Sequence, residues 1–216
     1  MDLLFLLISL IILIFSSILH EVAHGYVAYR LGDPTAKILG RLTLNPVKHI
    51  DPYMSIFMPL IFFLGSGGRF IFGGAKPVPV DPFNLRDGHK DLALVSLAGP
   101  LTNIILAILG ALLIHLLFPG QNFAEVNANG LGGTILADIV QLNLLLAIFN
   151  LVPIPPLDGS KVFALLLPPR EAAAYLSLGN MGMLILIVLL FFPIGSFSLM
   201  GIVSNLIDLA IRLLGL

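Results

Sequence analysis

Long apolar segments separated by short polar ones dominate the pattern along this chain. Between Leu3 and Leu19 only Ser9, Ser16 and Ser17 are polar, and the first segment, residues 3–31, stops at Gly32-Asp33-Pro34. A bilayer core about 30 Å thick needs about 20 apolar residues in a helix, so this segment predicts a spanning helix. By the same pattern we expect spanning helices at residues 91–118, 132–167, 172–192 and 197–215.

Two stretches depart from this pattern. Residues 53–65 are apolar but too short to span comfortably, and Pro59 interrupts them, so we expect a re-entrant segment. Residues 36–44 partly alternate between apolar and polar positions, which predicts a strand. Together with residues 76–81 it would form a small membrane-associated β-hairpin or sheet on the cytoplasmic side.

Composition places the chain in the membrane. Hydrophobic residues make up 58% and charged residues 11%, against about 25% charged in an average soluble chain. We therefore expect an all-α polytopic protein in the lipid bilayer, with about five spanning helices and one re-entrant segment, six hydrophobic segments in all. Residues 1–216 would form one domain, with a core at about 1–167 and two additional helices at about 172–215.

Charge and cysteine content narrow the possible partners and metal ligands. The net charge of −1, without a basic cluster, gives no support for a nucleic-acid partner. The chain has no cysteine, which excludes disulfides and thiolate metal sites, so any metal must be held by His, Asp, Glu or backbone oxygen.

The distribution of lysine and arginine predicts the orientation in the cell membrane. Basic residues collect on the cytoplasmic side of membrane proteins. If residues 3–31 enter from outside and residues 53–65 do not cross, all 11 Lys and Arg fall on the cytoplasmic side. If residues 53–65 crossed, the basic residues would be divided between the two sides. We therefore expect the N-terminus outside and the C-terminus in the cytoplasm.

Three ionisable residues stand near the cytoplasmic end of the first predicted helix, in the sequence HEVAH. His20 and His24 are four positions apart, so on a helix they lie about 40° apart on one face. Two imidazoles at this spacing can chelate one zinc ion, and Glu21 beside them can reach a metal-bound water. A chance match or a structural polar cluster would give the same letters, but ionisable groups within the membrane are costly and usually functional.

A zinc site of this kind needs a third protein ligand and an open position for water. Asp158 lies just before Lys161, near the cytoplasmic end of its segment, and so at a depth that matches the two histidines. A pair with Lys161 and a helix N-cap are the alternatives for this carboxylate. Position along the chain argues against the other candidates, which are His49, His89, His115, Glu125 and Asp138.

The paired motifs HEVAH and NLVPIPPLDG resemble those of the site-2 protease-type intramembrane zinc metalloproteases. FGGAKPVPV (72–80) and AGPLTN (98–103) also resemble segments of its small prokaryotic members, which have no PDZ or CBS domains. The resemblance implies one zinc per chain on His20, His24 and Asp158, with Glu21 as the catalytic acid and base. Asn150 would lie near the active site and help to hold the substrate oxyanion.

That resemblance also implies a substrate class and leaves rival functions to be tested. Its members hydrolyse peptide bonds of transmembrane proteins near the cytoplasmic face, in regulated intramembrane proteolysis. A membrane zinc or cation transporter would also keep His and Asp in the bilayer, but it needs no general base at this spacing. A non-catalytic membrane scaffold is the second rival. The Gly- and Pro-rich loop at 66–90 would be either a gate for substrate entry or a static plug.

Overall fold

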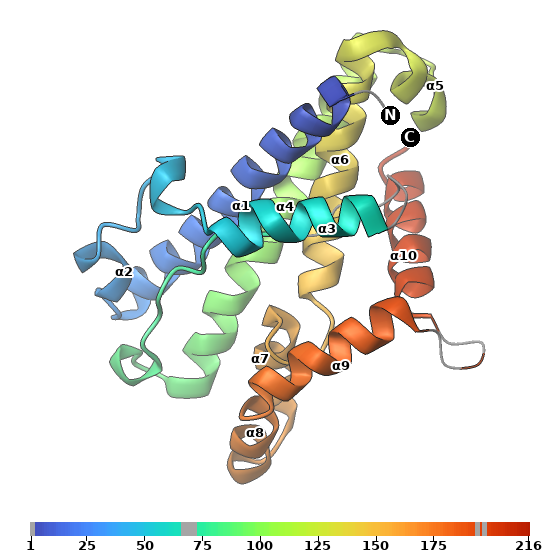
Figure 1. The fold of residues 1–216 in the computed structure, drawn as a ribbon. Coiled ribbons are helices and arrows are strands. Elements are labelled where there is room, and N and C mark those ends of the chain that lie inside the picture. Colours follow the sequence, from blue (N-terminus) through green and yellow to red (C-terminus); the bar gives the residue numbers. More distant parts are fainter. Residues whose placement is uncertain (1–2, 66–72, 193–194, 196–197) are drawn as a thin grey trace.

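The centre of the molecule is a group of three long helices. The computed structural model describes residues 3–65, 73–192, 195 and 198–216. Within these residues α1 (Leu3–Leu31), α4 (Gly88–Leu117) and α6 (Gly130–Asn150) are each long and apolar enough to cross a membrane (Figure 1). Helix α4 packs against both α1 and α6. The prediction of an all-α membrane protein is confirmed at this level.

Shorter helices complete the chain around this centre. Residues Pro52–Phe57 form a π-helical segment that runs into α3 (Met58–Gly65). Two short helices, α2 (Thr35–Ile38) and α5 (Phe123–Ala128), lie in connections between longer ones. Three 3₁₀ turns cover Pro46–Lys48, Pro82–Asn84 and Ala164–Leu166. The remaining helices are α7 (Asp158–Phe163), α8 (Pro169–Leu176), α9 (Gly179–Phe191) and α10 (Leu199–Leu213).

The ends of the helices follow from local chemistry. Helix α1 ends where Gly32 takes a φ of +117°, a backbone conformation that other residues rarely adopt. Helix α5 begins with a capping box, in which Asn122 accepts from the backbone N–H of Glu125 and the Glu125 carboxylate accepts from that of Asn122. Helix α6 ends just before a run of prolines that starts at Pro153 and cannot continue it.

One face of α1 carries large apolar side chains that are about half exposed among the described residues. Leu4, Leu7, Ile11 and Phe15 recur at helical spacing, and each is 48–56% exposed. A contiguous apolar surface of this kind marks a membrane or protein contact. Since α1 is also a candidate spanning helix, we assign this face to lipid.

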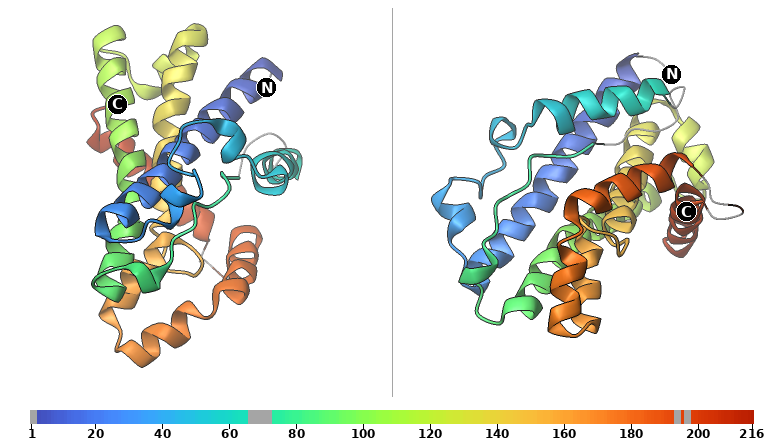
Figure 2. Two further views of the ribbon diagram at one scale, coloured as in Figure 1. Left: turned by 90° about the vertical axis from the view of Figure 1, so that its left-hand side faces the viewer. Right: turned by 60° about the horizontal axis from the view of Figure 1, so that its bottom comes forward.

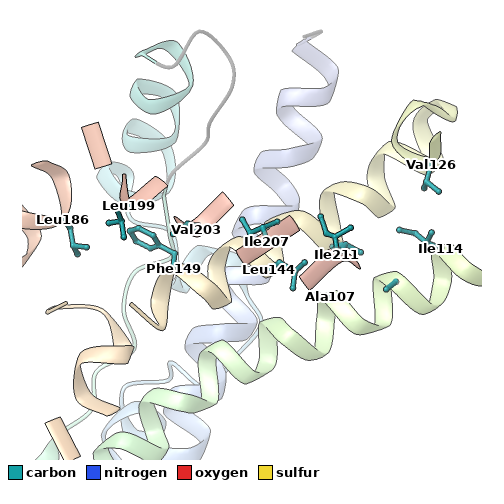
Figure 3. Close-up of a cluster of buried hydrophobic side chains, with 12 residues drawn as sticks. Ala107, Ile114, Val126, Leu144, Phe149, Leu186, Leu199, Val203, Ile207 and Ile211 are labelled. Carbon is teal, nitrogen blue, oxygen red and sulfur yellow. The ribbon is translucent and has the colours of Figure 1, made fainter. Parts of the chain in front are cut away.

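The main hydrophobic core lies between α4, α6 and α10 (Figure 3). Small residues on α4 allow α6 to come close: a Cβ on Gly110 would lie 2.9 Å from Cγ2 of Val140. Close approach at small residues is the usual way in which membrane helices pack, since lipid supplies no hydrophobic drive between them. The core residues from these three helices are Ala107, Ala111, Ile114, Val140, Leu144, Phe149, Leu199, Val203, Ile207 and Ile211.

The prediction of five spanning helices is not supported. Within the described residues three helices meet the length and composition for a span, or four if α8 and α9 count as one span. The predicted helix at 172–192 is in fact this pair, bent by 66°. Helix α10 has 15 residues, about 22 Å at 1.5 Å per residue, which is less than a bilayer core of about 30 Å.

The predicted placement of the two termini on opposite sides is not supported. Helix α10 runs back along the core, and the His115 Nε2 near the end of α4 lies 2.8 Å from the carbonyl oxygen of Leu214. Both ends of the chain therefore lie at the same end of the molecule (Figures 1 and 2). The charge argument failed at Arg212, because it assumed a full return crossing by residues 172–192, where the chain bends instead.

The predicted β-hairpin is also wrong. No strand occurs in the described part of the chain, and residues 36–44 begin in α2 and then turn at Gly40, whose φ is +63°. The side chain of Asp33 accepts hydrogen bonds from the backbone N–H and the hydroxyl of Thr35, which favours a helical turn there. Residues 76–81 are extended but form no β-ladder with another described segment. Pro77 and Pro79 have no N–H to donate to a neighbouring strand.

The apolar segment at 53–65 agrees with the expectation that it is too short to span. Six π-helical residues and the eight residues of α3 extend about 20 Å, less than a bilayer core of about 30 Å. Figure 2 shows this segment to one side of the bundle of α1, α4 and α6. The loop that follows, residues 66–72, lies outside the described residues.

Two adjacent glycines provide a test of the packing between α5 and α6. A Cβ on Gly133 would overlap the carbonyl oxygen of Val126, whereas a Cβ on Gly132 meets nothing within 4 Å. We expect Gly133→Ala to lower the thermal midpoint of the purified protein by several degrees, because overpacking costs about 1–3 kcal/mol. Gly132→Ala should leave it unchanged or raise it slightly, and equal midpoints for the two variants would contradict this packing.

Candidate metal centre

The two histidines of HEVAH lie side by side in the second half of α1. His20 and His24 are 5% and 7% exposed, so both rings are buried between helices. Their Nε2 atoms are 3.0 Å apart. The predicted placement of both imidazoles on one face of a helix is what the structure shows.

Asp158 completes the cluster from a distant part of the chain. It is the first residue of α7, and its Oδ2 lies 3.2 Å from Nε2 of His20 and 3.0 Å from Nε2 of His24. Its other oxygen, Oδ1, lies 3.0 Å from Nζ of Lys161. The pairing with Lys161 that the sequence offered as an alternative therefore exists, but it uses the oxygen that faces away from the histidines.

The three donor atoms fit a zinc ion. His20, His24 and Asp158 each offer one ligand atom, and all three atoms lie within 4.8 Å of one another. Ligand atoms about 2.0–2.1 Å from a tetrahedral zinc lie about 3.3 Å apart, close to the 3.0–3.2 Å seen between these donors. Among the described residues this is the one group of at least three His, Asp or Glu that could hold a metal in this way.

Hydrogen bonds on the far side of each ring point the Nε2 atoms at this common centre. Nδ1 of His24 lies 2.6 Å from the carbonyl oxygen of Val95, and Nδ1 of His20 lies 2.5 Å from Oδ1 of Asn103. Both partners are acceptors, so each Nδ1 carries the proton and each Nε2 presents a lone pair. Two such lone pairs facing one carboxylate oxygen repel unless a metal ion or a proton lies between them, and this donor set fits a metal site.

Helix α4 comes close enough to make these contacts because of a glycine. A Cβ on Gly99 would overlap the imidazole rings of both His20 and His24. Sequence reasoning did not find Gly99, Val95 or Asn103 as parts of the site, although AGPLTN was singled out. The available signal was Asn103, a fully buried amide in a membrane-spanning helix.

Glu21 lies in the same cavity and is held by a separate segment. The cavity has a volume of about 680 Å³ and is lined by the three candidate ligands together with Glu21 and apolar residues of several helices. Oε2 of Glu21 accepts a hydrogen bond of 2.7 Å from the backbone N–H of Val78. The predicted general base is therefore beside the metal centre but hydrogen-bonded to the FGGAKPVPV segment.

Asn150, at the last turn of α6, also lines this cavity. Its Nδ2 donates to the carbonyl oxygen of Leu146 at 2.9 Å, one turn back in the same helix. An amide nitrogen has two hydrogens, so one of them is left for another acceptor in the cavity. Its role toward a substrate stays a prediction.

The alternative ligand candidates lie elsewhere and have other partners. Glu125 belongs to the capping box of α5, and Oδ2 of Asp138 accepts from Ser9 at 2.6 Å. His115 contacts Leu214, and Nε2 of His49 lies 2.8 Å from the carbonyl oxygen of Thr43. His89 is exposed near the start of α4.

Two proteins with sequences similar to this chain carry names that describe them as zinc metalloproteases. Over 190 residues the chain is 42% identical to "Putative zinc metalloprotease YwhC" of Bacillus subtilis strain 168, covering 88% of this chain and 82% of that protein. Over 192 residues it is 32% identical to "Putative zinc metalloprotease Rip2" of Mycobacterium tuberculosis H37Rv, covering 89% and 70%. No solved structure matches the chain at a comparable level.

The family model for peptidase family M50 matches residues 8–136, which include HEVAH and AGPLTN. The match ends before Asp158, whereas the alignments to the two relatives extend over almost nine-tenths of the chain. The chain therefore belongs to peptidase family M50, the site-2 protease family of membrane zinc metalloproteases.

Proposed function

We propose that this protein is an intramembrane zinc metalloendopeptidase that cleaves transmembrane proteins near the cytoplasmic face. One observation carries the proposal. The Nε2 atoms of His20 and His24 and Oδ2 of Asp158 converge on one point, and the carboxylate of Glu21 lines the same cavity. A base beside an open metal position is the arrangement of a hydrolase.

The residues of the site would divide the reaction among them. His20, His24 and Asp158 would hold one zinc, which supplies an acidified water and polarises the substrate carbonyl. Glu21 would take the proton from the attacking water on its carboxylate and deliver it to the leaving amine. The second N–H of the Asn150 amide would donate to the developing oxyanion.

The contact between Glu21 and Val78 separates this proposal from its rivals. A transporter needs ligands that bind and release an ion, and a scaffold needs only packing. Neither gives a reason for a carboxylate to lie beside the ligands and accept a hydrogen bond from the backbone of another segment. A protease does, because this carboxylate must face water and substrate in turn.

The extended segment at residues 73–81 lies where a substrate would have to enter. Hydrogen bonds hold it along its length: Ser55 donates to the carbonyl of Gly74 at 2.7 Å, and Val78 donates to Glu21. At its far end the N–H of Asp81 donates to Asp33 at 2.7 Å. An unwound substrate could lie against this segment as an added strand, although Pro77 and Pro79 limit pairing to one edge.

Asp33 provides the fixed end of this segment. Burial raises the pKa of Asp33, but hydrogen bonds from Thr35, Asp81 and Asn84 outweigh it and hold the pKa below its usual range. Asp33 is therefore ionised at neutral pH, and its acceptor oxygens stay available to the backbone of the segment. Any movement is thus expected at the opposite end, near Gly73 and Gly74.

The membrane orientation that we propose follows from the charges around the metal end of the bundle. Arg30 lies in the last turn of α1 and Lys90 in the first turn of α4 at this end, and Lys161 contacts Asp158. Among the described residues Arg212 is the basic side chain at the opposite end, where α10 finishes. The metal end would face the cytoplasm, and both termini would lie outside.

The first prediction for this function concerns the metal. Purified protein is expected to bind about one zinc per chain, and His20→Ala, His24→Ala and Asp158→Ala should each weaken binding strongly, because three ligands leave none to spare. Glu21→Gln should keep zinc and lose cleavage of a transmembrane substrate. Metal analysis and a cleavage assay measure both properties.

The outcome for each variant discriminates between the functions. Zinc uptake by proteoliposomes that survives Glu21→Gln would support a transporter and contradict the proposed protease. Full zinc content in Asp158→Ala would show that the third ligand is another group.

The second prediction concerns orientation. A cysteine introduced by Gly74→Cys should react with a membrane-impermeant reagent only after the cytoplasmic face is opened, since Gly74 lies toward the metal centre. Cysteines introduced by Asn127→Cys and Leu216→Cys should both react in intact cells. Protection of Leu216→Cys in intact cells would restore the opposite placement of the termini.

The third prediction concerns the segment at 73–81. If it opens at Gly73 and Gly74, Gly73→Pro with Gly74→Pro should slow cleavage of a membrane-embedded substrate more than about tenfold, or about 1.4 kcal/mol. Zinc content and cleavage of a short soluble peptide should be nearly unchanged. Equal losses on both substrates would indicate a distorted active site, and no loss on either would assign the segment to packing.

A further inference from the structure

We infer that Asn103 and Asn143 are positioning residues that keep the proton of His20 on Nδ1, so that its Nε2 is free to bind zinc. The inference rests on the proposed metal site and adds to it two residues from helices that supply no ligand at this point. It is carried by a chain of hydrogen bonds that crosses from α6 through α4 to α1.

The chain starts at a backbone carbonyl of α6. Nδ2 of Asn143 donates to the carbonyl oxygen of Ile139 at 2.8 Å and to Oγ of Ser16 at 3.0 Å. Oδ1 of Asn143 accepts from Nδ2 of Asn103 at 2.8 Å. Oδ1 of Asn103 in turn faces Nδ1 of His20 at 2.5 Å.

Each link in this chain has one possible polarity. The carbonyl of Ile139 can only accept, so the NH₂ group of Asn143 must face it and its oxygen must face Asn103. Asn103 therefore points its own NH₂ group at Asn143 and its oxygen at His20. Since that oxygen can only accept, the proton of a neutral His20 lies on Nδ1.

Burial makes this polarity strict. Asn103 is 0% and Asn143 is 1% exposed, so water cannot replace a partner lost by turning either amide over. A reversed amide would place two acceptors or two donors against each other, and an unsatisfied buried polar group costs about 1–3 kcal/mol. The direction set at Ile139 is thus transmitted to the metal ligand.

The two histidines obtain the same tautomer by different means. His24 uses the carbonyl of Val95 directly, so its proton position depends on α4 alone. His20 depends on two amides and on the packing of three helices. Partners of this kind on the far side of a metal-binding imidazole typically change metal affinity by about 10–100-fold when they are removed.

The test combines zinc affinity with a direct measurement of the tautomer. In metal-free protein with ¹⁵N-labelled histidine, the neutral form of His20 is expected to carry its proton on Nδ1. Asn103→Leu should weaken zinc binding by about 10–100-fold, measured by competition with a chelator. Asn143→Leu should weaken it by about tenfold, the low end of this range, and give a mixture of the two His20 tautomers.

Ser9→Ala is the matched control. Ser9 and Asp138 form another polar contact between α1 and α6, outside this chain, so their loss should leave zinc affinity and the tautomer unchanged. Equal zinc loss in Ser9→Ala, or wild-type zinc affinity and tautomer in Asn143→Leu, would overturn the inference.

The wild-type measurements keep the inference testable even if a variant fails to fold. A proton on Nε2 of His20 in the metal-free wild type would overturn it directly. Wild-type protein that binds zinc with that tautomer would leave the proposed function standing. Wild-type protein that binds no zinc would instead contradict the function itself.

Discussion

Two imidazole nitrogens and one carboxylate oxygen that face one another inside a membrane protein need a cation or a proton between them. The Nε2 atoms of His20 and His24 and Oδ2 of Asp158 are 3.0–3.2 Å apart, and the Nδ1 atoms on the far sides of both rings are held by acceptors. The rest of the site follows from this requirement. Helix α4 must approach α1 closely at Gly99 to supply those acceptors, and the proline-rich turn after α6 must bring Asp158 back to the same depth.

The part of the site that depends on short-range spacing could be predicted from the sequence. Residues four positions apart on a helix share a face whatever surrounds them, so His20 and His24 were predictable as a pair. Asp158 was predictable because depth in a membrane can be counted along a helix from the charged end. The partners of the rings were not, because which face of α4 meets α1 depends on the close approach at Gly99, and helical periodicity does not encode that contact.

The errors in topology have a related cause. Counting basic residues assumes that every apolar segment of sufficient length crosses the bilayer, and residues 172–192 instead form two helices bent by 66°. Arg212 then falls at the opposite end from the other described basic residues. The strand prediction failed for a local reason, since alternation over a few residues at 36–44 competes with a helical turn whose first residue, Thr35, donates two hydrogen bonds to the Asp33 side chain. In both cases a local feature, a bend in one segment and the hydrogen bonds of Asp33 in the other, outweighed a rule that holds on average.

Glu21 links the chemistry of the site to the segment that covers it. Its Oε2 accepts from the N–H of Val78, and because Pro77 and Pro79 flank this residue, it is the one backbone donor between them. Under the proposed function this carboxylate is the base, and it accepts this hydrogen bond while the segment is in place. Displacement of the segment by a substrate strand would therefore open the cavity and free the base in one movement. If the chain is the protease proposed above, a single hydrogen bond would couple access to the cavity with release of the base, and a substrate would take the place of the protein's own backbone.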